Sequence, residues 1–87
     1  MLDKRSFYID GAWVPPAIPT DIEVLDPATE KLIAVISAGS QADVDKAVAA
    51  AKRAFATWSR TGVDTRLELL EKLLAVYRRR YEEMAQT

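Results

Sequence analysis

Cysteine and histidine are both absent from this sequence of 87 residues. The absence of cysteine excludes a disulfide framework and a thiolate nucleophile, and it fits a reducing compartment. The absence of histidine removes the side chain that most often exchanges protons near neutral pH. Together the two absences remove the usual ligands of zinc. The sequence therefore excludes the common thiol-, histidine- and zinc-based forms of catalysis within the chain itself.

Glycine is scarce, and its three residues stand far apart: Gly11, Gly39 and Gly62. Neither a dinucleotide-binding fingerprint nor a phosphate-binding P-loop can be formed from isolated glycines. A serine nucleophile would need a lysine as its base, and no such arrangement is evident at the serines, which are Ser6, Ser37, Ser40 and Ser59. The sequence thus assigns no catalytic, cofactor-binding or metal-binding residue.

Neither sign of charge is in excess, because 12 basic and 13 acidic residues leave a net charge of −1. The one basic run, Arg78-Arg79-Arg80, falls on a predicted helix, where successive side chains point about 100° apart and form no single stripe. Glu82 and Glu83 follow Arg78 and Arg79 by four residues, which is close enough for ion pairing. We therefore expect no nucleic-acid partner.

Carboxylate pairs occur at Asp43 with Asp45 and at Glu82 with Glu83. Acid–base catalysis would require a cleft that separates the pKa values of the two partners. We interpret the first pair as negative charge at the start of a helix and the second as a solvated helix face.

Long hydrophobic runs are also missing. The longest, residues 32–38, is interrupted by Ser37 and is far too short to cross a bilayer. Residues 1–11 contain no signal-peptide core. We expect a cytoplasmic protein without a membrane partner.

Hydrophobic residues nevertheless make up 49% of the chain, which favours one small folded domain. In the first half, two short apolar segments flank Asp10-Gly11. This dipeptide favours a type I′ turn, in which both central residues have positive φ, so a hairpin is predicted over residues 7–14. A second hairpin over residues 22–37 is predicted around a turn at Pro27.

The second arm of that hairpin, residues 32–36, is apolar on both faces. A strand of this kind should be covered on both sides. The short chain has little material with which to cover it.

Helical periodicity begins after Ser40, whose hydroxyl is expected to accept the amide of Asp43. The pattern predicts a helix over about residues 41–58. Its repeating apolar positions are Val44, Ala47, Val48, Ala51, Phe55 and Trp58. We expect Trp13, Phe55 and Trp58 to be core residues and not groups that stack on a ligand.

A break at Gly62 precedes a second predicted helix over about residues 65–86. Thr65 and Glu68 match the capping-box pattern at its start. Two apolar stripes suggest that this helix is buried on two sides. The first stripe comprises Leu67, Leu70, Leu74, Tyr77, Tyr81 and Met84, and the second Leu69, Leu73 and Val76. No glycine or proline closes the helix, so we expect a truncated chain.

These elements predict an α+β fragment over residues 1–87, with two N-terminal β-hairpins followed by two α-helices. Four of its segments, in this order, resemble the N-terminal region of the NAD(P)-dependent aldehyde dehydrogenase superfamily. Residues 7–14 are similar to the family's opening hairpin, (F/Y)-I-D-G-x-W, and residues 23–30 to its turn, x-V-x-N-P-A-T-G. Asp26 replaces the asparagine of that turn, and Glu30 replaces its glycine, which fits positive φ less well.

The other two segments are helical. Residues 42–55, followed by Trp58, are similar to the family's first helix, and Arg66 to the arginine that opens its next helix. The resemblance implies a parent enzyme of several hundred residues with a Rossmann-like cofactor domain and a catalytic domain. Such enzymes oxidise aldehydes to carboxylic acids, or to acyl-CoA in one branch, with a catalytic cysteine, a glutamate that activates water, and NAD or NADP as hydride acceptor.

The resemblance places none of those working residues in the N-terminal region. It therefore implies that this chain by itself binds no cofactor and is inactive. In the family, these hairpins and helices wrap the cofactor-binding domain, so the implied partner is the remainder of the dehydrogenase chain. The alternative is a stand-alone α+β interaction module that self-associates. In isolation the chain is expected to form a homo-oligomer, because a two-sided helix and open strand edges favour pairing.

Overall fold

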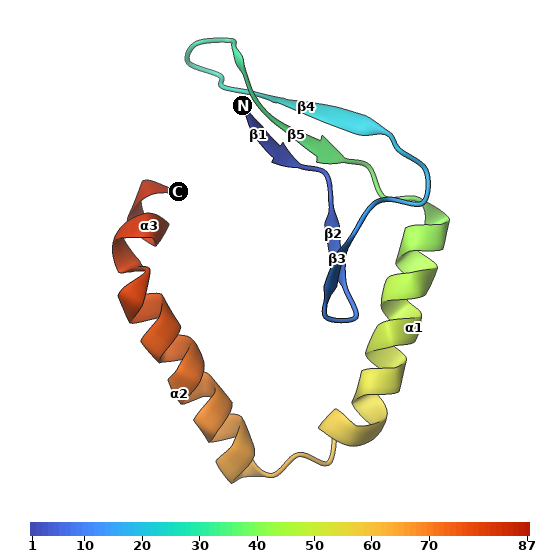
Figure 1. The fold of residues 1–87 in the computed structure, drawn as a ribbon, viewed down its shortest axis with the longest axis vertical. Coiled ribbons are helices and arrows are strands. Elements are labelled where there is room, and N and C mark those ends of the chain that lie inside the picture. Colours follow the sequence, from blue (N-terminus) through green and yellow to red (C-terminus); the bar gives the residue numbers. More distant parts are fainter. The chain divides into compact units, whose positions relative to one another are not determined.

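The computed structural model describes all 87 residues and contains five strands and three helices (Figure 1). This confirms the predicted α+β class. The chain divides into two compact units, Met1–Phe55 and Ala56–Thr87. The elements are β1 (Leu2–Lys4), β2 (Phe7–Ile9), β3 (Ala12–Val14), β4 (Asp21–Leu25), β5 (Leu32–Ser37), α1 (Gln41–Trp58), α2 (Val63–Arg79) and α3 (Tyr81–Gln86).

Strands β2 and β3 form the first predicted hairpin, with Tyr8 opposite Trp13 in the register. At its tip Asp10 has φ 55° and Gly11 has φ 76°. The prediction of positive φ at both central residues is confirmed, and this geometry suits the twist of a two-residue hairpin. The rings of Tyr8 and Trp13 lie with centroids 5.2 Å apart on one face of the hairpin.

Strands β4 and β5 form the second hairpin, and they belong to a three-stranded sheet of order β1-β5-β4. The sequence analysis missed β1, which pairs in parallel with β5 and places Leu2 beside Ala34. Its three residues are all exposed and show no apolar alternation. Periodicity could not reveal this strand, because its position depends on a partner more than 30 residues away in the chain.

The turn between β4 and β5 is stabilised by Asp26. Its carboxylate accepts hydrogen bonds from the Ala28 amide at 2.9 Å and the Thr29 hydroxyl at 3.0 Å. These bonds, led by the one from Ala28, lower the pKa of Asp26 below its ordinary value. Glu30 closes the turn with its amide donating to the Asp26 carbonyl at 2.7 Å and with φ at 57°. A residue with a side chain thus occupies the left-handed region where the family pattern has glycine.

Helix α1 begins with a reciprocal arrangement between Ser40 and Asp43. The Asp43 carboxylate accepts the Ser40 amide and hydroxyl, both at 2.9 Å, and the Asp43 amide lies 3.4 Å from the Ser40 hydroxyl oxygen. This confirms Ser40 as the predicted cap. The same carboxylate accepts the amide of Ala17 at 2.9 Å, so it also fixes the connector before β4. Asp43 is buried, and these bonds hold its pKa below the ordinary value.

The small residues of α1 face the β2–β3 hairpin. Ala50 is buried, and Arg53 forms an ion pair of 3.1 Å with Asp10 at the hairpin tip. The packing stays open, because a hollow of about 340 Å³ remains between residues 8–11 and the alanines of the helix. Alanine lets the hairpin approach the helix closely, but it fills little of the space between them.

In the second unit, α2 begins at Val63 after Gly62, and no side chain caps it. The prediction of a capping box at Thr65 and Glu68 is wrong, because the helix starts two residues earlier and Thr65 already lies inside its first turn. The single helix expected over residues 65–86 is also interrupted, since Arg80 has φ −106° and ψ 19° between α2 and α3.

The acidic start of α1 generates a prediction about pH. Replacing Asp43 with Asn removes the charge that the Ser40 and Ala17 amides bind. The pKa of Asp43 is lowered in the folded chain by those hydrogen bonds, so its contribution is present above the unfolded pKa of about 4 and is lost as the pH falls through the folded pKa. We expect Asp43→Asn to melt at a lower temperature at neutral pH and to lose less stability on acidification than the native chain.

Thermal melting followed by circular dichroism, from neutral pH down to about pH 3, measures both effects. Asp45→Asn is the matched control, because the only hydrogen bond of the Asp45 carboxylate comes from the Gln41 side chain, at 2.9 Å. Equal melting of the Asp43 variant and the native chain at every pH would contradict the assigned role.

The left-handed Glu30 generates a second prediction. Replacing Glu30 with Gly removes the clash of Cβ in this conformation, and the gain exceeds the added flexibility of the unfolded chain. We expect the free energy of unfolding to rise by about 0.5–1 kcal/mol in urea titrations. Glu30→Ala keeps a Cβ and should change little. A less stable glycine variant would show that the Glu30 side chain stabilises the turn in another way.

Candidate functional site

The side chains that could take part in catalysis, which in this chain are mainly the carboxylates, form no metal-binding cluster, since no group of three or more is positioned to hold a metal ion. No helix in the chain combines the length and the apolar character needed to cross a membrane. The features that could still form a site are the carboxylates, one arginine cluster and the exposed apolar residues.

The two carboxylate pairs of the sequence are each engaged in local hydrogen bonding. Asp43 binds backbone amides and Asp45 accepts the Gln41 side chain, so the two share no proton. Glu83 forms an ion pair of 2.7 Å with Arg80, and this partner lowers the pKa of Glu83. A general acid would need a raised pKa. Both pairs therefore fit structural roles and do not fit acid–base catalysis.

The partner of Glu83 differs from the expectation. Of the four ion pairs in the structure, none involves Arg78 or Arg79. Arg80 takes Glu83 three residues later with both its Nε and its Nη2, at 2.8 and 2.7 Å. Pairing at three-residue spacing thus replaced the predicted four-residue spacing, and it occurs at the interruption between α2 and α3.

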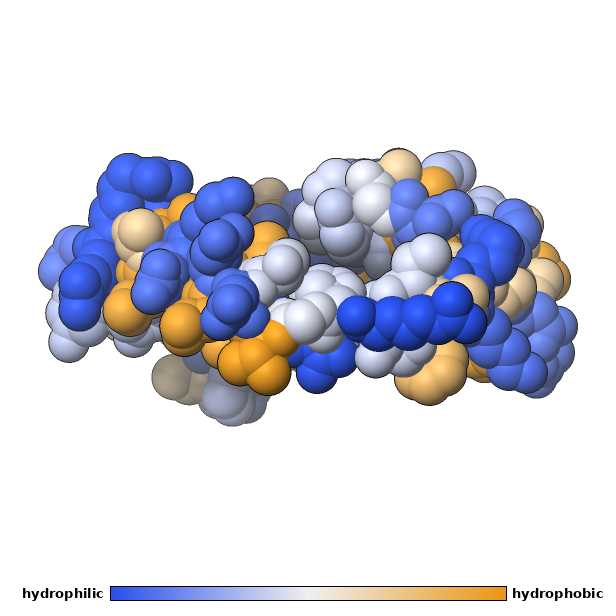
Figure 2. Space-filling view, turned by 90° about the horizontal axis from the view of Figure 1, so that it is seen from below, coloured by the Kyte–Doolittle hydropathy of each residue, from blue (hydrophilic) through white to orange (hydrophobic).

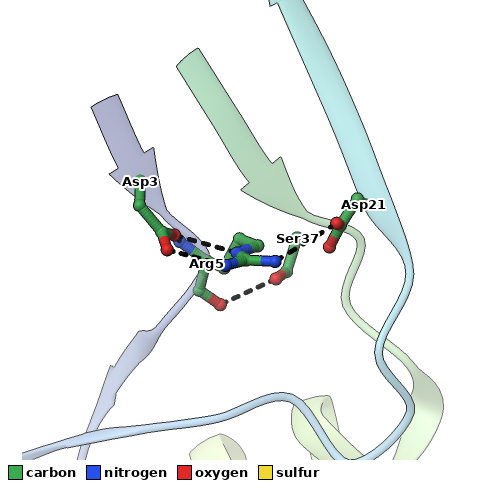
Figure 3. Close-up of polar contacts among 4 residues, drawn as sticks. All are labelled: Asp3, Arg5, Asp21 and Ser37. Atoms are coloured by element: carbon green, nitrogen blue, oxygen red, sulfur yellow. Dashed lines mark hydrogen bonds and ion pairs between the residues drawn. The ribbon is translucent and has the colours of Figure 1, made fainter. Parts of the chain in front are cut away.

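Arg5 is the centre of the densest polar cluster (Figure 3). Its Nη2 lies 2.7 Å from Asp3 and its Nη1 lies 3.4 Å from Asp21, while its carbonyl accepts the Ser37 hydroxyl at 2.7 Å. The cluster links all three strands of the sheet, because Asp3 lies on edge strand β1, Ser37 on central strand β5 and Asp21 on edge strand β4. The hydrogen bonds from Arg5 lower the pKa of Asp3, and Asp3 in turn raises that of Arg5.

An open hollow of about 280 Å³ adjoins this cluster and is lined by three prolines as well as by Arg5. Two carboxylates already neutralise the guanidinium, so the hollow offers no spare positive charge for an anion. The sequence analysis missed Arg5. Its only sequence signal is the spacing of Asp3 and Arg5, which places both side chains on one face of an extended segment. We interpret the cluster as structural.

Three aromatic residues are more exposed than the sequence predicts. Trp13, Phe55 and Trp58 were predicted to be core, but they are 72%, 68% and 48% exposed in this chain. Trp58 contacts the guanidinium of Arg66 at 5.7 Å from its ring centroid, and the same arginine lies 3.4 Å from the Trp58 carbonyl. Phe55 and Trp58 lie in α1 as predicted and Trp13 lies in β3, but no layer of the chain covers them.

Apolar exposure extends over both units. Ala50 is the only buried hydrophobic residue of the chain, and no residue of the second unit is buried. Figure 2 shows hydrophobic residues, in orange, lying at the surface among hydrophilic ones, in blue. On β5 the expected two-sided cover is missing, because Leu32, Ile33 and Ile36 are exposed.

Both stripes of the second unit are equally open. A shallow apolar hollow of about 180 Å³ lies at the junction of α2 and α3, lined by Leu73, Val76, Tyr77, Arg80 and Met84. Exposed apolar patches of this kind mark contact surfaces. Each of these patches, on β5, on α1 and on α2–α3, can bind another apolar surface, and each is taken by itself as a candidate contact surface.

Comparison with known proteins identifies relatives of this chain. A family model described as "Aldehyde dehydrogenase family" matches residues 13–87. The chain is 51% identical over 85 residues to a 3-succinoylsemialdehyde-pyridine dehydrogenase from a Pseudomonas species, covering 98% of this chain and 18% of that protein. It is 41% identical over 86 residues to a putative aldehyde dehydrogenase from Staphylococcus aureus, covering 99% of this chain and 18% of that protein.

Two solved structures of aldehyde dehydrogenases also match this chain. The crystal structure of an aldehyde dehydrogenase from Bartonella henselae matches with a TM-score of 0.93 and 51% identity, over 99% of this chain and 18% of that one. A mutant of aldehyde dehydrogenase C from Pseudomonas syringae, complexed with NAD+ and octanal, matches with a TM-score of 0.88 and 46% identity, over 94% and 17%. The chain spans about a fifth of the length of these relatives, and it belongs to the aldehyde dehydrogenase family as an N-terminal region.

Proposed function

We propose that this chain is the N-terminal structural segment of an NAD(P)-dependent aldehyde dehydrogenase that oxidises an aldehyde to a carboxylic acid. One observation carries the proposal: a chain that matches about 18% of its relatives' length buries only one hydrophobic residue of its own. Its apolar surface is therefore available to cover, and to be covered by, the remainder of the enzyme.

The distribution of the apolar residues supports an internal position in a larger fold. Strand β5 is apolar on both faces, and the apolar residues of α2 occupy about half of the helix circumference in two stripes. A surface helix of a small domain needs one stripe only. Burial yields about 25 cal/mol for each Å² of apolar surface removed from water, so covering these faces favours docking onto the enzyme body.

The chemistry of the enzyme is assigned to residues outside this segment. The chain has no cysteine for a covalent intermediate, and of its two carboxylate pairs Asp43 is bound by backbone amides and Glu83 by Arg80. The relative from Pseudomonas syringae was crystallised with NAD+, which supports NAD as the cofactor of the parent enzyme. In this proposal the segment contributes stability and shape to the enzyme, and it contacts neither hydride nor aldehyde.

The proposal predicts that the purified chain has no dehydrogenase activity. With octanal and either NAD or NADP, absorbance at the wavelength of the reduced cofactor should stay at the level of the buffer control. The physical reason is the missing thiol nucleophile. Reduction of the cofactor above that level would contradict the assignment of the chemistry to residues outside the segment.

A chimera tests the positive part of the proposal. Replacing the matching 18% of the Bartonella henselae enzyme with this chain should give a folded and active aldehyde dehydrogenase. Leu70→Asp in that chimera should destabilise it by several kcal/mol, because the enzyme body would bury an unpaired charge. The matched control is Glu68→Asp, which changes the polar face of the same helix. An inactive chimera, or one indifferent to Leu70→Asp, would refute the structural role.

A further inference from the structure

We draw no further inference here: the strongest candidate, the side-chain cluster of Arg5 with Asp3 and Asp21 beside the open hollow of about 280 Å³, carries nothing, because the two carboxylates already neutralise the guanidinium and nothing in the structure shows what covers the hollow.

Discussion

The main physical constraint on this chain is that it buries very little apolar surface. A folded chain is stable when the burial of apolar side chains outweighs the conformational entropy lost on folding. Here Ala50 is the only buried hydrophobic residue, although about half of the chain is hydrophobic. Sheet, hairpin and helices are thus assembled with their apolar faces open, and these faces determine what the chain can bind.

Because the chain has almost no apolar core, local polar contacts fix the direction of its backbone. Asp43 fixes the start of α1 and the connector at Ala17, and Arg5 links the end of β1 to Asp21 on β4. Asp26 shapes the turn between β4 and β5. Such contacts hold backbone directions well, but exposed ion pairs contribute little stability. They orient surfaces that a further apolar layer then stabilises.

This division explains how the segment would contribute to an aldehyde dehydrogenase under the proposed function. Under that proposal the segment supplies apolar elements that the enzyme body covers, and catalysis requires that reacting groups be held in place by a rigid scaffold.

Local signals in the sequence determined much of the fold. Asp10-Gly11 specified the first hairpin, Ser40 with Asp43 specified the start of α1, and the 3.6-residue period specified the helices, because each depends on neighbours a few residues away. The two-sided apolar pattern also predicted faces that the short chain cannot cover, and apolar residues of β5 and α2 are exposed. Periodicity could not show whether Trp13, Phe55 and Trp58 are covered, since a stripe records which face is apolar and not what lies against it.

Tertiary structure alone decided the contacts between distant parts of the chain. The parallel pairing of β1 with β5, the ion pairs of Arg5 with Asp21 and of Arg53 with Asp10, and the bond from Ala17 to Asp43 join residues 16 to 43 positions apart. No local rule encodes such partners, because they form only once the backbone has brought the segments together. The start of α2 at Val63 and its interruption at Arg80 were read only from the backbone, because the sequence offered a competing cap at Thr65.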